Sequence, residues 1–179
     1  MTKQRGRLAA ISGQYGEETV EALMTAAGFP VVTYPNHEGS TPIAVRQYPM
    51  PHPYRPDDPR SGKNDFMLFS GVIKAYCQVK NQNSSGTCDE KLSFAFDIAR
   101  YGLSDDPYDL FALILMGTWW RDNPNIVEWA RKKCQEFEML ANGVRAKVKA
   151  TIIVGPRELS SWLRNIPTSQ TTNGLFRTH

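Results

Sequence analysis

The chain has 179 residues, 41% of them hydrophobic, and a formal net charge of +3, which predicts one globular domain with a core of its own. Its longest apolar run, Leu110 to Met116, is far shorter than the roughly 18 residues of a membrane-spanning helix, and no signal peptide is expected. Three cysteines without CxxC spacing do not predict a zinc site and favour free thiols in a reducing cytoplasm. The mildly basic charge permits a nucleic-acid partner.

The first predicted element is a helix from Gly13 to Gly28, whose apolar residues fall on one face at the 3.6-residue period. Gly28-Phe29-Pro30 is expected to end it, and residues 31–34 could form a short strand. Residues 35–63 are interpreted as a long, semi-rigid loop, because seven of the chain's twelve prolines lie between Pro35 and Pro59.

Two strands are predicted next, over residues 66–69 and 72–80, with a turn at Ser70-Gly71 between them. A capping-box pattern that begins at Thr87 then predicts a helix to Tyr101. A buried strand, a helix, a strand and a helix follow over residues 110–116, 125–140, 147–154 and 156–164. This order predicts a mixed α/β sheet with helices on both faces, in a single domain over residues 1–167 with a polar tail over 168–179.

An acid and a lysine fall on the two neighbouring strands in the first half of the chain. Asp65 opens the first strand, and Gln78-Val79-Lys80 begins thirteen residues later in the second. Residues two apart on a strand face the same way, so Gln78 and Lys80 should share a face while Val79 points into apolar packing. A carboxylate with oxygen-rich neighbours suits Mg²⁺, and a lysine beside it can orient a water or stabilise charge on a phosphate. The pattern therefore predicts a metal-dependent phosphodiesterase site.

This arrangement resembles the PD-(D/E)XK nuclease superfamily, which includes type II restriction enzymes and archaeal-type Holliday-junction resolvases. The resemblance covers residues 13–101, in the order of a helix with an acid, a strand with Asp, a strand with Glu-x-Lys and a helix. It implies a restriction-endonuclease-like fold and a homodimeric, Mg²⁺-dependent DNA endonuclease, for which Mn²⁺ can substitute, in a bacterial, archaeal or phage setting. Restriction-type cutting and junction resolution are both consistent with it.

The resemblance also assigns residue roles. Asp65 takes the place of the family's Asp and Lys80 that of its Lys. Glu17 is the candidate helical acid because it lies nearer the apolar face than Glu18, although an acid exposed near a helix start gives the same pattern. The implied metal ligands are Asp65, Gln78, Glu17 and the carbonyl of Val79.

Two positions depart from the family pattern. Asn64 rather than Pro precedes Asp65, and the literal Pro56-Asp57 lies inside the proline-rich segment. Gln78 replaces the family's Glu, which keeps a carbonyl oxygen but removes a negative charge. The alternative is therefore a catalytically inactive DNA-binding protein of the same fold, with either a natural or a deliberate Glu→Gln change.

Candidate DNA contacts come mainly from residues 46–63 of the proline-rich segment, since Arg side chains bind phosphates or base edges and aromatic rings stack on bases. A surface excursion or a dimer contact is the other interpretation of that segment. Gln82 and Lys91 follow the motif, and each can equally bond its own turn or helix. The full candidate set is Arg46, Tyr48, His52, Tyr54, Arg55, Arg60, Lys63, Gln82 and Lys91. The sequence has no GxxxxGK[ST] loop, so no nucleotide cofactor is expected.

Overall fold

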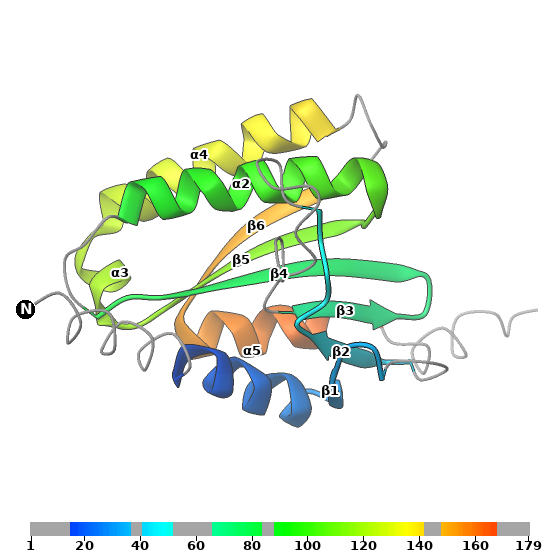
Figure 1. Cartoon of the computed structure of the whole chain (residues 1–179). Helices are drawn as coiled ribbons and strands as arrows, with labels where there is room; N and C mark the ends of the chain where they lie inside the picture. Colours follow the sequence, from blue (N-terminus) through cyan, green and yellow to red (C-terminus); the bar gives the residue numbers. More distant parts are fainter. Residues whose placement is uncertain (1–14, 37–40, 52–65, 84–87, 142–147, 168–179) are drawn as a thin grey trace, which may run out of the picture.

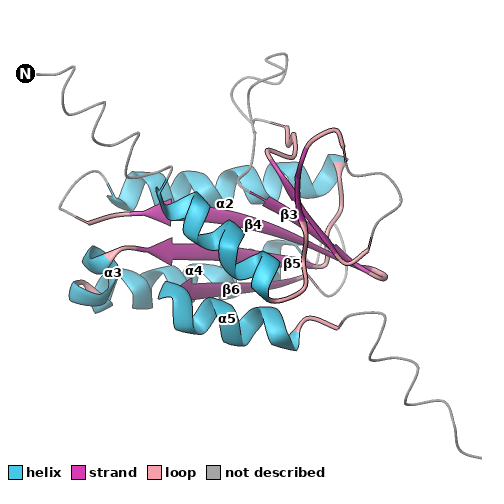
Figure 2. Cartoon of the chain, turned by 90° about the horizontal axis from the view of Figure 1, so that it is seen from below, coloured by secondary structure: helices cyan, strands magenta, loops and turns pink. Residues whose placement is uncertain are grey.

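The computed structural model describes residues 15–36, 41–51, 66–83, 88–141 and 148–167. A six-stranded mixed sheet forms the middle of three layers (Figures 1 and 2). Helices α2 (Cys88–Asp105) and α4 (Pro124–Ala141) cover one face. Helix α5 (Gly155–Asn165) and a helix over residues 15–26 cover the other. The predicted α/β class, with helices on both faces, is confirmed.

The strands lie side by side in the order of the chain. They are β1 (Val31–Thr33), β2 (Ile43–Arg46), β3 (Phe66–Ser70), β4 (Ile73–Asn81), β5 (Leu110–Met116) and β6 (Lys149–Val154). Strand β3 is antiparallel to both neighbours, and the other adjacent pairs are parallel. All strands except β3 therefore end at the same side of the sheet, which we call the carboxyl edge. It lies at the left of Figure 1, beside the short helix α3 (Thr118–Asp122).

Several local predictions are confirmed. The first helix stops before Gly28, which has φ 90°, and the Phe29 N–H donates to the Met24 carbonyl at 2.9 Å. The turn between β3 and β4 contains Gly71 at φ 57°, a left-handed conformation that favours glycine. Pro156 lies in the first turn of α5, where its missing N–H costs nothing.

Two elements differ from the expectation. The loop expected over residues 35–63 is wrong for residues 43–46, which form β2 with Ile43, Ala44 and Val45 buried. Pro42 directly precedes this strand, a position where a proline removes no ladder hydrogen bond. Helix α3 was not expected either, and its five residues place Trp120 in the core.

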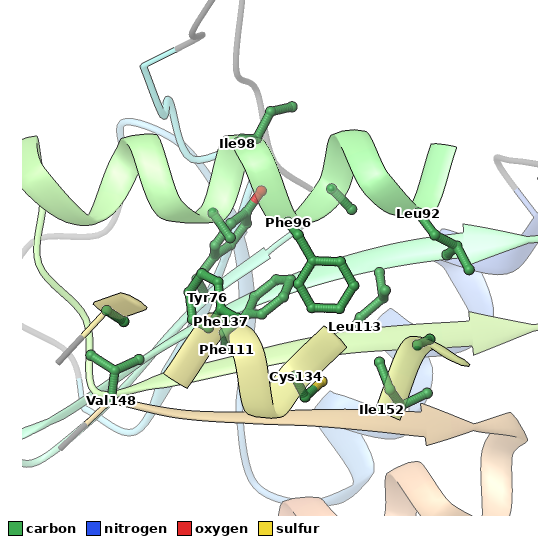
Figure 3. Packing of buried hydrophobic residues seen from close by; sticks show 14 of the residues in the cluster. Tyr76, Leu92, Phe96, Ile98, Phe111, Leu113, Cys134, Phe137, Val148 and Ile152 are labelled. Atoms are coloured by element: carbon green, nitrogen blue, oxygen red, sulfur yellow. The ribbon is translucent and has the colours of Figure 1, made fainter. Parts of the chain in front are cut away.

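One core fills the space between the sheet and helices α2 and α4. Rings of Tyr76, Phe96, Phe111 and Phe137 meet there (Figure 3) with neighbouring centroids 5.2–5.6 Å apart. Such aromatic pairs add about 0.5–1.5 kcal/mol each beyond the burial of their area. Packed rings therefore add to the aliphatic contacts that hold α2 and α4 on this face of the sheet.

A second core lies on the opposite face. It contains Val20 and Met24 from the first helix and Leu159 and Leu163 from α5. These residues recur at intervals of four along each helix, as expected for an apolar stripe that faces a sheet. Both helices thus start at the carboxyl edge and run back beneath the sheet (Figure 2).

Candidate active site

The carboxyl edge gathers the ends of the three central and last strands, β4, β5 and β6. Strand β4 ends there at Asn81, β5 at Met116 and β6 at Val154. In open α/β sheets, ligands bind outside the carboxyl ends of the strands. The Gln78-Val79-Lys80 motif occupies the last part of β4, so it lies at the side of the sheet where a site is expected.

Strand pairing fixes how this motif faces. Gln78 and Lys80 pair with Leu113 and Leu115 of β5, which belong to the core under α2 and α4. Val79 pairs with Ile114, and both belong to the second core. Gln78 and Lys80 therefore share the α2–α4 face while Val79 is packed on the other, as the alternation of a strand requires.

Gln78 is a buried polar side chain with an unsatisfied acceptor. It is 5% exposed, and its Oε1 has no hydrogen-bond donor among the described residues. Leaving such an acceptor without a partner costs about 1–3 kcal/mol. An amide oxygen of this kind can be satisfied by a water or a cation, so Gln78 fits the role of a metal ligand.

The described part of β3 covers only the first part of β4. Strand β3 pairs with β4 from Ser70, opposite Ile73, to Phe66, opposite Cys77. In the described part of the chain, the stretch of β4 from Gln78 to Asn81 continues past β3 and is paired with β5. Asp65 lies outside the described residues, but it is bonded to Phe66, whose partner Cys77 directly precedes Gln78.

Glu17 lies at the same edge but on the opposite face. Its helix packs on the second core through Val20, and the buried Gly16 lies so close to β4 that a Cβ there would be 2.5 Å from the Asn81 Cβ. The Glu17 carboxylate forms an ion pair with Arg46 at 3.4 Å. The structure therefore brings Glu17 beside the end of β4 without placing it on the face of Gln78 and Lys80.

Arg46, a candidate DNA contact, ends β2 on the side of the first helix. Its guanidinium forms ion pairs with Glu17 and Glu21, each at 3.4 Å, and 27% of its side chain is exposed. With two carboxylates this close, the charge of Arg46 is already partly offset inside the molecule.

Tyr48, another candidate DNA contact, lies at the opposite end of the motif strand. The Lys74 ammonium is 5.2 Å from the centre of its ring, and the Phe69 ring is 5.8 Å away. Burial and the hydrogen bond with Asp106 raise the pKa of Tyr48 above its ordinary value. Tyr48 therefore packs beside Lys74 and Phe69 and is not brought to Gln78.

Gln82 is held through its backbone just past the motif. Its N–H donates to the Met116 carbonyl at 2.8 Å, and its carbonyl accepts from the Trp119 N–H at 3.2 Å. Gly117 permits this approach: it has φ 99°, and a Cβ there would lie 2.3 Å from the Gln82 oxygen. Sequence reasoning missed Gly117, although a glycine directly after a buried strand was the available signal.

The remaining candidates divide into two groups. Lys91 is exposed in the first turn of α2, which begins near the carboxyl edge (Figure 1). Those outside the described residues are His52, Tyr54, Arg55, Arg60, Lys63 and the tail over 168–179.

The carboxylates needed for a metal are not clustered in the described part of the chain. Among those residues, no three His, Cys, Asp or Glu side chains are close enough to hold an ion. Cys77 and Cys134 are buried free thiols. A metal at Gln78 would therefore depend on Asp65.

Comparison of the chain with protein-family models gave no match, and neither did comparison with curated proteins or with solved structures. In the described residues, no helix is long and apolar enough to cross a membrane.

Proposed function

We propose that this protein is a metal-dependent DNA endonuclease with a restriction-endonuclease-like fold, whose site is formed by Asp65, Gln78 and Lys80. The observation that carries the proposal is the buried Oε1 of Gln78, which has no hydrogen-bond partner among the described residues and lies on the same face of β4 as Lys80. A polar atom that is costly to leave unsatisfied is expected at a functional site, where its partner arrives with the ligand.

The order of the elements supports the same proposal. A helix over residues 15–26 precedes the β3–β4 hairpin, with β1 and β2 between them, and α2 follows the hairpin. The helix, the hairpin and α2 thus come in the order that the PD-(D/E)XK resemblance gives. Asp65 precedes the first described residue of β3, and Gln78 follows the last residue of β4 that pairs with β3. An acid and an amide in adjacent strand positions are close enough to share one ion.

The chemistry is divided among these side chains. The Asp65 carboxylate and the Gln78 Oε1 would hold Mg²⁺ or Mn²⁺, with the Val79 carbonyl as a further ligand that the resemblance implies. Glu17, the other ligand that the resemblance implies, lies on the opposite face and pairs with Arg46, so it is left out of this set. The cation supplies positive charge that offsets the charge of the phosphodiester. The Lys80 ammonium donates hydrogen bonds that orient the attacking water and stabilise charge on the phosphate oxygens. Because Gln78 is neutral, it attracts the cation less than a glutamate would.

The test is a cleavage assay on duplex DNA and on a four-way junction, with Mg²⁺ and with Mn²⁺. We expect the natural chain to cut at least one DNA and Gln78→Glu to cut at lower metal concentration. Asp65→Asn and Lys80→Ala should each cut about 10²–10³-fold more slowly. Gln135→Glu, on the exposed surface of α4, makes the same amide-to-acid change away from the site and should cut like the natural chain.

The other outcomes separate the alternatives. If Gln78→Glu cuts DNA and the natural chain does not, the natural chain belongs to the alternative class, a catalytically inactive DNA-binding protein. If neither chain cuts either DNA while both retain their fold by circular dichroism, the nuclease proposal fails.

A further inference from the structure

The last strand, β6, has an outer edge that faces away from the sheet. It ends the strand order and pairs with β5 alone among the described strands. The Lys149 N–H donates to the Asp109 carbonyl at 3.0 Å, on the β5 side. Because N–H groups alternate along a strand, those of Ala150, Ile152 and Val154 point to the outer edge. Such an edge is a template for another strand.

Two carboxylates occupy this edge. The Ala150 N–H donates to Glu138 Oε1 at 2.8 Å, and the Val154 N–H donates to Glu158 Oε2 at 2.9 Å. Glu138 comes from α4 and Glu158 from α5, which lie on opposite faces of the sheet. Lys149 also holds Glu138 in place, at 3.1 Å. The N–H groups of Ala150, Ile152 and Val154 form the outward ladder of β6. Its first and last N–H groups are thus bonded to side chains from different helices.

The geometry of the edge is self-complementary. Antiparallel pairing of two copies about Ile152 would place Ala150 of each copy opposite Val154 of the other, and all three outward positions would be hydrogen-bonded pairs. A hollow of about 380 Å³ lies beside Ala150, Thr151 and Ile152, between α4 and the strand. A strand can therefore approach the centre of the edge, but each carboxylate takes the place of a carbonyl that the second strand would offer.

We propose that the outer edge of β6 is a strand-pairing surface for a second copy of this chain, which Glu138 and Glu158 hold closed. This inference concerns assembly and does not depend on the proposed nuclease activity. Removal of both carboxylates frees the N–H groups of Ala150 and Val154 and opens the ladder. In the natural chain, these two contacts therefore keep a second copy from pairing with β6.

The test measures particle mass by sedimentation velocity over a range of concentrations. The double variant Glu138→Ala/Glu158→Ala should shift, as concentration rises, to twice the mass of the natural particle. Glu138→Gln/Glu158→Gln loses the same two charges but keeps an acceptor oxygen at each position, so it should retain the natural mass. Adding Thr151→Lys to the alanine variant should reverse the association, because lysine on an edge strand opposes pairing.

Three results would overturn the proposal. They are an alanine double variant that keeps the natural mass at every concentration, a glutamine double variant that associates equally, and association that Thr151→Lys does not reverse. If circular dichroism shows that the alanine double variant does not fold, the single variants Glu138→Ala and Glu138→Gln are compared instead. Glu138→Ala should then associate as concentration rises, and Glu138→Gln should retain the natural mass.

Discussion

Replacing Gln78 by methionine should stabilise the protein and abolish the proposed cleavage. Gln78 is 5% exposed and its Oε1 has no donor among the described residues, so the folded state carries a desolvated acceptor. Methionine has a similar length and volume and no such acceptor. An apolar replacement removes the cost of the unsatisfied group, whereas loss of Oε1 removes the oxygen that would bind the metal.

The size of the effect follows from two opposing contributions. An unsatisfied buried acceptor costs about 1–3 kcal/mol, and a volume-conserving change in a packed core costs less than about 1.5 kcal/mol. The middle of each range gives a rise in the free energy of unfolding of about 1–2 kcal/mol. In a domain of this length each kcal/mol moves the melting temperature by about 2–4 °C, so an increase of roughly 2–8 °C is expected.

The assay compares thermal and urea unfolding of the two proteins without added metal, followed by the DNA cleavage measurement. Gln135→Met, at an exposed position on α4, is the matched control and should stay within about 0.5 kcal/mol of the natural chain. A Gln78→Met protein that is less stable than the natural chain would contradict this prediction, because it would mean that the Gln78 oxygen is already satisfied in solution.

Three further outcomes are expected. Gly117→Ala should lower the free energy of unfolding, measured with urea, by roughly 3 kcal/mol, because the backbone strain alone costs about 1–3 kcal/mol and the new Cβ would lie 2.3 Å from the Gln82 oxygen. Gly155→Ala is the control: Gly155 also has a positive φ but lies in open space, so this change should cost less. Tyr108→Phe removes a buried 2.6 Å hydrogen bond to the Ala99 carbonyl and should cost about 0.5–1.5 kcal/mol in the same assay, and an unchanged urea midpoint would contradict this. Burial raises the pKa of the Cys134 thiol to about 12 from 9.0, so the thiol ionises at lower pH in the unfolded chain than in the folded one. The free energy of unfolding should therefore fall as the pH rises from 9 towards 12. An equally steep fall in Cys134→Ala would show that other groups cause it.

Elements with a strong local pattern were predictable from sequence. The continuous apolar run of β5 and the glycine that ends the first helix each have one physical interpretation, and both were confirmed. Strand β2 was not predictable, because Ile43, Ala44 and Val45 form a run of only three apolar residues among prolines. Burial of that strand depends on β3, which lies twenty residues further along the chain.

The site was predictable only in part, for a similar reason. Alternation along β4 fixes that Gln78 and Lys80 share a face. The side of the sheet that the first helix covers decides where Glu17 lies, and helical periodicity does not contain that information. The unsatisfied state of the Gln78 oxygen likewise depends on which side chains surround it after the layers have packed.

Strand order that equals chain order has a consequence for synthesis. Each strand from β2 to β6 pairs first with the strand made just before it, so none has to wait for a later segment to obtain its first neighbour. During translation the sheet can therefore grow by one strand at a time from its β1 side. The hairpin with β3 forms the first part of β4 early, and the end of β4 that carries Gln78 and Lys80 is paired once β5 has left the ribosome.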